Sequence, residues 1–369
     1  MGFQNKKLKL AIGAGGTGGH IIPALAFANW LRGNHPEVEF KFFCGARNIE
    51  KEIYSAHSIE PEVLPIEGSP MWGNLFQRTS RLWRMIISFG IVRNYFKKWK
   101  PDVVITFGGY VSLPLLHVSF RAKIPAFVHE QNVIAGKVTK LAYKAGFEVL
   151  SGWEKLEGVK EYRYVGIPLR RFQCLPRWEA WHKLNMKDHP PSGPIVLSLG
   201  GSLFSEKMRT LALKLASRES FKKWFFLVLG DVAHPNKLKE NVYLLPKTWE
   251  VGNLYSLADI VISRAGASTL AELSYWNIPA IVVPWLEAAD GHQLANAKLF
   301  EEKGYGRIWL EGEENIKSLE NKILDLHSRR LKKKTTNTMA DLADRSSELV
   351  WESLKRELKG DVDIDGEQA

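Results

Sequence analysis

The stretch Gly13-Ala14-Gly15-Gly16-Thr17-Gly18-Gly19-His20 decides the fold. It follows the apolar run 8–12 and precedes residues 21–33, whose pattern predicts a helix with Pro23 in its first turn. A strand, a glycine-rich turn and a helix together present backbone N–H groups and the positive end of a helix dipole to an anion. This unit is typical of a doubly wound α/β domain.

The glycine spacing also fits other nucleotide-binding motifs. Gly13, Gly15 and Gly18 satisfy the pattern G-x-G-x-x-G. The second predicted strand, 38–43, ends in Cys44-Gly45 and lacks the acidic residue that would hold a ribose, which argues against a dehydrogenase. No G-x-x-x-x-G-K-[ST] occurs, so a P-loop is excluded.

His20 is the unusual residue of this stretch. The positive end of a helix dipole disfavours a charged imidazole, so a histidine at a helix N-terminus tends to stay neutral and can accept a proton. A single histidine in such a position is also often structural. His20 is therefore a candidate general base that the remaining sequence has to support.

Size and charge limit the class of protein. The 369 residues with 45% hydrophobic content suit two domains with separate cores. A net charge of +11 favours an anionic partner, such as a nucleotide, a nucleic acid or an anionic lipid. The two cysteines, Cys44 and Cys174, form no disulfide framework and fit a reducing compartment. No segment predicts a transmembrane helix or a signal peptide.

Strand and helix patterns alternate through two regions, which predicts two parallel-sheet domains. Residues 1–166 form the first domain, residues 167–194 a proline-rich linker with a helix at 176–184, and residues 195–330 the second domain. The predicted strands are 8–12, 38–43, 62–66, 102–107, 126–128, 195–199, 224–229, 242–245, 259–263 and 279–283. Residues 331–359 predict a helix at the domain junction, and the acidic tail 360–369 predicts disorder.

Residues 71–100 differ from the rest of the first domain. They contain seven Lys or Arg residues, no Asp or Glu, and many large apolar side chains, including Trp72, Trp83 and Trp99. Basic charge beside tryptophan on a helix favours an anionic membrane surface as partner. A core helix with a solvated basic face is the alternative, and no recognised nucleic-acid motif accompanies the segment.

Polar turns follow two further strands of the first domain. Gly108-Gly109-Tyr110 follows the strand 102–107, and His129-Glu130-Gln131-Asn132 follows the next strand. Ligands bind at the carboxyl ends of the strands in open α/β folds, so these turns are candidate site residues. Capping would explain each turn singly, since Asn132 would make a good N-cap for a helix over 133–145.

The second domain repeats the pattern. Gly200-Gly201-Ser202 follows its first strand, and Ala267 to Glu272 open a helix whose N–H groups could hold a diphosphate. Glu272 could accept hydrogen bonds from ribose hydroxyls, or it could be a first-turn acid favoured by the helix dipole. His292 and Gln293, in a polar loop after an apolar strand, could bind a sugar.

In this order, the motifs resemble the MurG family of bacterial transferases, in glycosyltransferase family 28. They are GGTGGH at 15–20, FGGY at 107–110, HEQN at 129–132 with Gly136, VGxPxR at 165–170, GGS at 200–202, SRAGAxTxxE at 263–272 and HQxxNA at 292–297. The resemblance implies a GT-B fold, with two Rossmann-like doubly wound domains facing a cleft. It also implies an inverting transfer without metal or cofactor, from UDP-N-acetylglucosamine to the C4 hydroxyl of lipid I, giving lipid II at the cytoplasmic face of the cell membrane.

The resemblance assigns roles to single residues. It implies that His20 is the base, with Glu130 and His129 supporting the acceptor or sharing the proton transfer. The motifs also imply the residues that bind the donor. From the first domain these are Thr17, Gly18, Gly19 and Asn132. Arg170 and Ser202 would contact phosphate, Thr248 uracil, and His292 with Gln293 the sugar, while the diphosphate and ribose would be bound by Ala267, Ser268, Thr269, Leu270, Ala271 and Glu272. Tyr110 and Arg264 complete the set of substrate-binding residues. The glycine turns of the first domain would take the acceptor diphosphate, and residues 71–100 would lie on the membrane beside the polyprenyl chain.

Three of the motifs depart from the family pattern: Leu203-Phe204-Ser205 follow the third glycine turn, Ile167 stands in place of asparagine, and Ser268 in place of a larger residue. These departures leave open that the protein is a relative of the family that uses another lipid-linked acceptor. Two rival functions are a glycolipid synthase acting on diacylglycerol and a non-catalytic nucleotide-sugar-binding protein. The HEQN and FGGY motifs favour lipid I over the first rival, and His20 with Glu130 favours an enzyme over the second.

Overall fold

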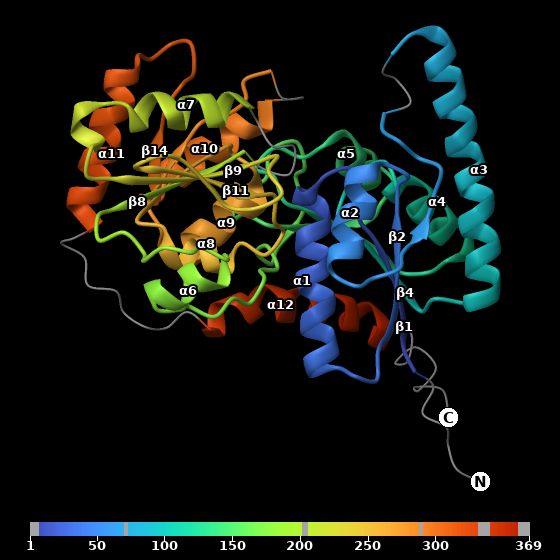
Figure 1. Cartoon of the computed structure of the whole chain (residues 1–369). Helices are drawn as coiled ribbons and strands as arrows, with labels where there is room; N and C mark the ends of the chain where they lie inside the picture. The colour runs from blue at the N-terminus through green and yellow to red at the C-terminus, as the bar shows by residue number, and fades with distance from the viewer. Residues whose placement is uncertain (1–6, 70–72, 201–205, 288–290, 331–339, 361–369) are drawn as a thin grey trace, which may run out of the picture. The chain divides into compact units, whose positions relative to one another are not determined.

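The computed structural model describes residues 7–69, 73–200, 206–287, 291–330 and 340–360 (Figure 1). The chain divides into two compact units, Met1–Arg170 with Ala340–Ala369, and Arg171–Met339. Each unit holds a seven-stranded sheet with helices between its strands. The predicted fold class, two Rossmann-like α/β domains, is confirmed.

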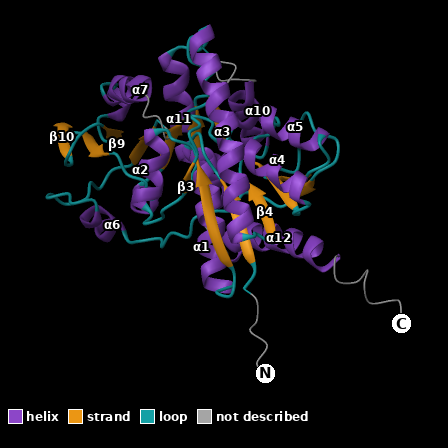
Figure 2. Cartoon of the chain, turned by 90° about the vertical axis from the view of Figure 1, so that its right-hand side faces the viewer, coloured by secondary structure: helices purple, strands orange, loops and turns teal. Residues whose placement is uncertain are grey.

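The first unit has a parallel sheet in the order β3-β2-β1-β4-β5-β6-β7. Its strands are β1 (Lys9–Gly13), β2 (Glu39–Cys44), β3 (Glu62–Val63), β4 (Val103–Thr106), β5 (Ala126–Glu130), β6 (Glu148–Ser151) and β7 (Arg163–Tyr164). Its helices are α1 (Gly18–Asn34), α2 (Asn48–Ala56), α3 (Leu75–Trp99), α4 (Ser112–Ala122), α5 (Lys137–Lys144) and α12 (Ala340–Gly360). The central strands are buried apolar runs, because α1 and α2 cover one face of the sheet and α3 and α4 the other (Figures 1 and 2).

The glycine-rich turn differs from its prediction in where the helix starts. α1 begins at Gly18, three residues earlier than expected, because the Thr17 carbonyl accepts the N–H groups of His20 (3.1 Å) and Ile21 (3.2 Å). Thr17 itself is extended and is the N-cap. His20 therefore lies in the first turn, as predicted, whereas Pro23 lies beyond it.

The second unit has the order β10-β11-β9-β8-β12-β13-β14, parallel except for β10, which pairs antiparallel with β11. Its strands are β8 (Ile195–Leu199), β9 (Phe225–Gly230), β10 (Asn236–Lys239), β11 (Val242–Pro246), β12 (Ile260–Ser263), β13 (Ala280–Val282) and β14 (Gly306–Ile308). Its helices are α6 (Arg177–Lys183), α7 (Glu206–Ala216), the 3₁₀ helix η1 (Glu219–Phe221), α8 (Gly252–Leu257), α9 (Ala267–Tyr275), α10 (His292–Glu302) and α11 (Ile316–Arg330). The antiparallel edge strand β10 was not predicted, since all four of its residues are exposed and show no apolar alternation.

The predicted linker and the C-terminal helix are parts of the two units. The second unit begins at Arg171, and α6, which falls within the expected linker 167–194, is tied to it because Arg177 Nη2 donates to Asp259 Oδ2 at 2.7 Å. The helix expected over 331–359 is described as Ala340–Gly360 and belongs to the first unit, where Trp351 packs on His35 with ring centroids 5.0 Å apart. Residues 361–369 of the predicted tail lie outside the described residues. None of the described helices has the length and apolar character needed to cross a bilayer.

Candidate active site

His20 is seated against the second glycine turn of the first unit. Its ring is half-buried and lies so close to Gly108 that a Cβ atom there would meet His20 Nδ1 at 2.7 Å. Gly108 also has a φ of +101°, in the left-handed region that favours glycine. The FGGY turn therefore supplies the bare backbone on which the imidazole rests.

A chain of hydrogen bonds runs from His20 into the first unit. His20 Nδ1 lies 2.9 Å from Gln131 Oε1, and Gln131 Nε2 lies 2.9 Å from both Nδ1 and the carbonyl oxygen of His129. His129 Nε2 in turn lies 2.8 Å from the carbonyl oxygen of Gly166. The His129 ring is stacked on Phe107, with centroids 5.1 Å apart, and burial lowers its pKa to about 4, so it is neutral at physiological pH.

Gln131 is absent from the predicted site residues, although a signal for it exists in the sequence. Side chains two residues apart in a strand point to the same face of a sheet. His129 and Gln131, at the end of β5, therefore share a face, and Glu130 points to the other. The alternation of side chains along a strand, combined with the candidate role of His20, would have favoured His129 and Gln131 over Glu130 as the residues that contact His20.

Glu130 holds the loop after β5. One carboxylate oxygen accepts from Asn132 N and Nδ2, both at 3.0 Å, and the other accepts from Gly136 N at 2.9 Å and Thr139 Oγ1 at 2.6 Å. These four donors fill the usual acceptor capacity of a carboxylate, and Glu130 is buried. Its contacts fix the loop after β5, and its predicted part in acceptor binding or proton transfer stays a prediction.

The same contacts correct the prediction for Asn132. Asn132 does not cap a helix over 133–145, because the Glu130 carboxylate takes the Asn132 amide groups and keeps residues 131–136 as a loop. α5 begins only at Lys137, with Gly136 as its N-cap. Asn132 is half-buried in this loop and directly follows Gln131 in the chain.

The first glycine turn is fixed by side chains of α2 and the residue before it. Arg47 Nη1 donates to the Gly16 carbonyl at 2.7 Å, and Tyr54 Oη donates to the Ala14 carbonyl at 2.8 Å. The Glu50 carboxylate accepts from Gly45 N at 2.6 Å and from the backbone of Gly16. Burial nevertheless raises the pKa of Glu50 above its ordinary value. This buried acid beneath the turn was not predicted.

In the second unit, the turn after β12 leads into α9 through Gly266, the N-cap. Ala267, Ser268 and Leu270 are buried, and Thr269 and Ala271 are half-buried, so small side chains surround the first turn. The first amides of any helix lack intrahelical acceptors, and they point toward the carboxyl edge of this sheet. Glu272 is buried one turn further, where its Oε2 accepts a hydrogen bond of 2.9 Å from Tyr255 Oη.

Arg264, also after β12, is held by the scaffold. Its guanidinium donates to the Val283 carbonyl at 3.2 Å and to Glu311 Oε2 at 3.2 Å. Glu311 lies in the loop between β14 and α11. Arg264 thus links three loops at the carboxyl edge of the second sheet.

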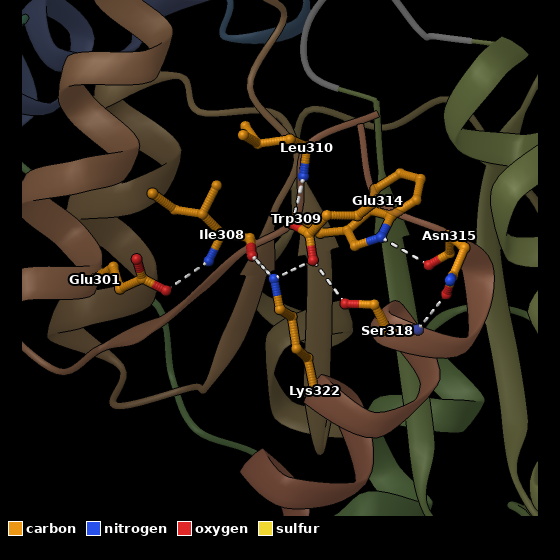
Figure 3. Close-up of polar contacts among 8 residues, drawn as sticks. All are labelled: Glu301, Ile308, Trp309, Leu310, Glu314, Asn315, Ser318 and Lys322. Atoms are coloured by element: carbon orange, nitrogen blue, oxygen red, sulfur yellow. Dashed lines mark hydrogen bonds and ion pairs between the residues drawn. The ribbon is translucent and has the colours of Figure 1, made fainter. Parts of the chain in front are cut away.

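The loop that carries Glu311 is itself rigidly bonded (Figure 3). Glu314 accepts from Leu310 N at 3.0 Å, from Ser318 Oγ at 2.6 Å and from Lys322 Nζ at 2.5 Å, and Lys322 also donates to the Ile308 carbonyl. Burial acts to raise the pKa of Glu314, but these hydrogen bonds outweigh it and the pKa is lowered. The loop therefore presents Glu311 to Arg264 in a defined position.

The remaining predicted residues within the described part of the chain are exposed or half-buried and lie in loops or in the first turn of α10. Gln293, in the first turn of α10 beside His292, accepts from Trp285 N at 2.9 Å. Thr248 accepts from Glu250 N at 3.0 Å in the loop after β11. Tyr110 and Arg170 are half-buried in the first unit, next to the turns that hold His20 and Gly166. Ser202 and residues 203–205, which depart from the family pattern, lie outside the described residues.

The helix α3 has one face packed and one face open. Met85, Ser88, Val92 and Phe96 are buried against the sheet and α4. At the helical spacing of the opposite face, large apolar side chains are exposed, among them Phe76 at 82% and Trp83 at 65%. Leu75, Leu82, Ile86, Ile87 and Ile91 belong to the same exposed face. The predicted basic residues Arg81 and Arg84 fold back onto residues 67–69, where Arg84 pairs with Glu67.

Solved structures with this fold define a class. The chain aligns with the crystal structure of Acinetobacter baumannii MurG with a TM-score of 0.65 at 21% identity, over 95% of this chain and 99% of that one. It aligns with a UDP-glucosyltransferase from Polygonum tinctorium with a TM-score of 0.63 at 14% identity, over 96% and 99%. At these identities the likeness establishes the fold alone, which is that of the two-domain GT-B glycosyltransferases.

Sequence comparison narrows the class to a family. The glycosyltransferase family 28 N-terminal domain matches residues 10–150, and the family 28 C-terminal domain matches residues 195–349. The chain belongs to glycosyltransferase family 28.

Relatives similar to this chain include two transferases with the same name, UDP-N-acetylglucosamine–N-acetylmuramyl-(pentapeptide) pyrophosphoryl-undecaprenol N-acetylglucosamine transferase. The protein from Clostridioides difficile is 32% identical over 86% of this chain and 81% of its own length. The protein from Aquifex aeolicus is 30% identical over 94% of this chain and 99% of its own. The similarity therefore spans both units.

Proposed function

We propose that this protein transfers N-acetylglucosamine from UDP-N-acetylglucosamine to the C4 hydroxyl of the N-acetylmuramyl unit of lipid I, the undecaprenyl-pyrophosphoryl pentapeptide substrate, and so makes lipid II. The relatives that match over both units are transferases of this sugar to this acceptor. The observation that carries the proposal is His20, a half-buried imidazole set in the first turn of α1 with its Nδ1 engaged by Gln131.

In the proposed reaction, His20 is the general base. The acceptor oxygen forms a bond to the anomeric carbon of the sugar while its proton passes to the imidazole. The bond between that carbon and the diphosphate oxygen breaks, and UDP leaves with the electron pair. His129 and Glu130 support this step through structure: His129 through its contact with Gln131, and Glu130 by fixing the loop that contains Asn132.

The second unit is the proposed donor domain. The first-turn amides of α9 hold the diphosphate, and the Glu272 carboxylate, oriented by Tyr255, accepts hydrogen bonds from the ribose hydroxyls. Arg264 and Ser202, together with Arg170 at the end of the first unit, add positive charge or a hydroxyl donor near phosphate. Thr248 contacts uracil through the backbone, and His292 and Gln293 contact the sugar. Stabilising the departing diphosphate with such groups is a large part of the rate enhancement in this chemistry.

The first unit is the proposed acceptor domain. The two glycine turns beside His20 bind the acceptor diphosphate, with Tyr110 in the second turn. Thr17, Gly18, Gly19 and Asn132 contribute contacts to the donor from this unit. The exposed apolar face of α3 lies in the membrane interface at the cytoplasmic side and accompanies the polyprenyl chain. Aromatic and aliphatic side chains of this size, exposed together on one helix, are costly in water and favourable at the headgroup boundary.

Turnover with defined substrates tests the proposed reaction. The purified protein is incubated with radiolabelled UDP-N-acetylglucosamine and a short-chain lipid I analogue, and the lipid-linked disaccharide is measured. Product from this pair, with much less from UDP-glucose or from diacylglycerol as acceptor, is expected. Product from diacylglycerol instead would identify a glycolipid synthase, and absence of UDP release with every acceptor would identify a non-catalytic binding protein.

Vesicle binding tests the membrane proposal separately. Phe76→Ser with Trp83→Ser should weaken sedimentation with vesicles that contain anionic lipid, whereas Phe120→Ser should not. Phe120 is a matched control because it is 63% exposed but lies on α4, outside the α3 face. Equal binding by the two proteins would contradict the assignment of α3 to the membrane.

A further inference from the structure

The starting point is the Gly166 carbonyl, which determines the tautomer of His129. A carbonyl oxygen only accepts hydrogen bonds, so the His129 Nε2 atom, 2.8 Å away, carries the hydrogen. Because His129 is buried and neutral, its Nδ1 has a lone pair and is an acceptor. Gly166 is fixed in turn: its φ is +77°, and a Cβ there would lie 2.3 Å from Ser346 Oγ of α12.

The Gln131 amide has only one orientation compatible with these neighbours. One end of the amide lies 2.9 Å from both His129 Nδ1 and the His129 carbonyl oxygen. Both of these atoms are acceptors, so the NH₂ group must face them, and an oxygen there would meet two lone pairs. The amide oxygen therefore points the other way, to His20 Nδ1 at 2.9 Å.

We propose that Gln131 is a positioning residue that holds His20 in the tautomer with hydrogen on Nδ1 and the lone pair on Nε2. An amide oxygen accepts only, so His20 Nδ1 must donate to it. Within the described residues, His20 Nε2 has no hydrogen-bond partner and is the atom that takes the acceptor proton. The inference rests on the proposed function in one respect only, namely that His20 is the base.

This hydrogen-bond relay, from the Gly166 carbonyl through His129 and Gln131 to His20, explains why four separate motifs converge on the His20 ring. GGTGGH contributes His20, FGGY contributes the bare Gly108 and the Phe107 ring that stacks on His129, HEQN contributes His129 and Gln131, and VGxPxR contributes the Gly166 carbonyl. Since Gln131 is neutral, it orients His20 without the charge of a carboxylate. The contact therefore fixes which nitrogen of His20 faces Gln131 and leaves Nε2 for the acceptor proton.

The tautomers can be read directly by long-range proton–nitrogen correlation spectra of the full-length protein labelled in histidine, at a pH where the rings are neutral. We expect His20 to be protonated on Nδ1 and His129 on Nε2. In Gln131→Met, which has a similar volume but no amide, His20 should lose its preference for Nδ1–H. His57, whose Nδ1 lies 2.8 Å from the Ile53 carbonyl oxygen, is the internal control and should not change.

Kinetics provide a second measurement. Gln131→Met should lower kcat by roughly 10- to 100-fold with an unchanged KM for UDP-N-acetylglucosamine, since a wrong tautomer removes the base without touching the donor. Gln131→Glu places a carboxylate beside His20 Nδ1 and should move the acid limb of the kcat/KM profile to higher pH. A role limited to folding would leave that limb in place.

The outcomes separate this inference from the proposed function. His20 protonated on Nε2 in the wild-type protein, or an unchanged His20 tautomer in Gln131→Met, would overturn the relay even if His20→Ala were inactive. The expected spectra combined with full turnover by His20→Ala would leave the relay intact and remove His20 as the base. The wild-type spectrum alone decides the first question, so the test survives a variant that does not fold.

Discussion

The carboxyl edges of the two sheets are built in opposite ways. After β5 in the first unit, consecutive polar side chains bond to one another and to backbone carbonyls, and this fixes the ring of His20. After β12 in the second unit, α9 begins with small, largely buried residues, and buried Glu272 accepts a hydrogen bond from Tyr255. Under the proposed function, the first arrangement orients the general base and the second offers amides and a carboxylate to the donor. Substitutions in the first unit should therefore change the rate of chemistry, and those in the second should change donor affinity.

The largest expected effect is that of His20→Ala. Loss of a general base typically costs roughly 10²- to 10⁴-fold in kcat. The dissociation constant of UDP-N-acetylglucosamine should stay near the wild-type value, because His20 is not among the proposed donor contacts and most of these lie in the second unit. Turnover assays and calorimetry measure the two quantities, with His189→Ala as a control on an exposed histidine. An unchanged kcat in His20→Ala would contradict the expectation that the first unit determines the rate of chemistry and the second determines donor affinity.

The second prediction concerns pH and the His129 ring. Because burial lowers its pKa from 6.5 to about 4, the unfolded chain binds a proton in this window that the native chain does not. Stability is therefore fully present above pH 6.5 and falls as the pH drops toward 4, by about 3 kcal/mol for this group.

Hydrogen exchange of the β5 amides, corrected for intrinsic rates, measures this loss, with the β12 amides of the second unit as the internal reference. In His129→Phe, which keeps an aromatic ring next to Phe107, the opening free energy of β5 should depend less on pH. The same slope in the wild-type protein and this variant would contradict the assignment of the acid sensitivity to His129.

The third prediction addresses the donor domain. Glu272→Ala removes a charged acceptor for the ribose hydroxyls, and hydrogen bonds to charged groups are worth about 1.5–3 kcal/mol, so UDP affinity should fall by roughly 10- to 100-fold. Titration calorimetry with UDP measures the change, and Glu302→Ala on the exposed side of α10 is the control. A loss of kcat with intact UDP affinity would reverse the expected pattern.

The elements that sequence could predict are those whose signal is local. The apolar runs predicted the central strands, and the glycine turn predicted that His20 stands at a helix start, because both depend on residues adjacent in the chain. The start of α5 was wrong because Glu130 holds the loop up to Gly136. Cooperation between Gly166 and His129 could not be predicted, since it needs a turn 37 residues away to present one carbonyl.

Some of the site residues that the sequence analysis missed lie outside the motifs that they contact. Glu50 lies beneath the first glycine turn, and Tyr255 lies against Glu272 from another helix, so neither belongs to the motif that it supports. Motifs therefore select candidate ligand-binding residues more readily than the residues that orient them. The contacts of Gln131 with His20 and His129 are the clearest example, because strand alternation pairs Gln131 with His129 but no spacing in the sequence links either residue to His20, 111 positions from Gln131.

The smallest effect expected is that of Tyr255→Phe. The substitution removes one hydrogen bond to Glu272 Oε2 and keeps the ring that packs on Phe172, with centroids 6.0 Å apart. A net loss of about 1 kcal/mol corresponds to roughly fivefold weaker UDP binding, with kcat at saturating donor unchanged. Gln131→Met deletes an orienting partner in the same way but should act on kcat, because the residue it orients takes part in bond making. If Tyr255→Phe lowered kcat and left UDP binding intact, orientation in the second unit would serve the reaction itself, and the contrast between the two edges would fail.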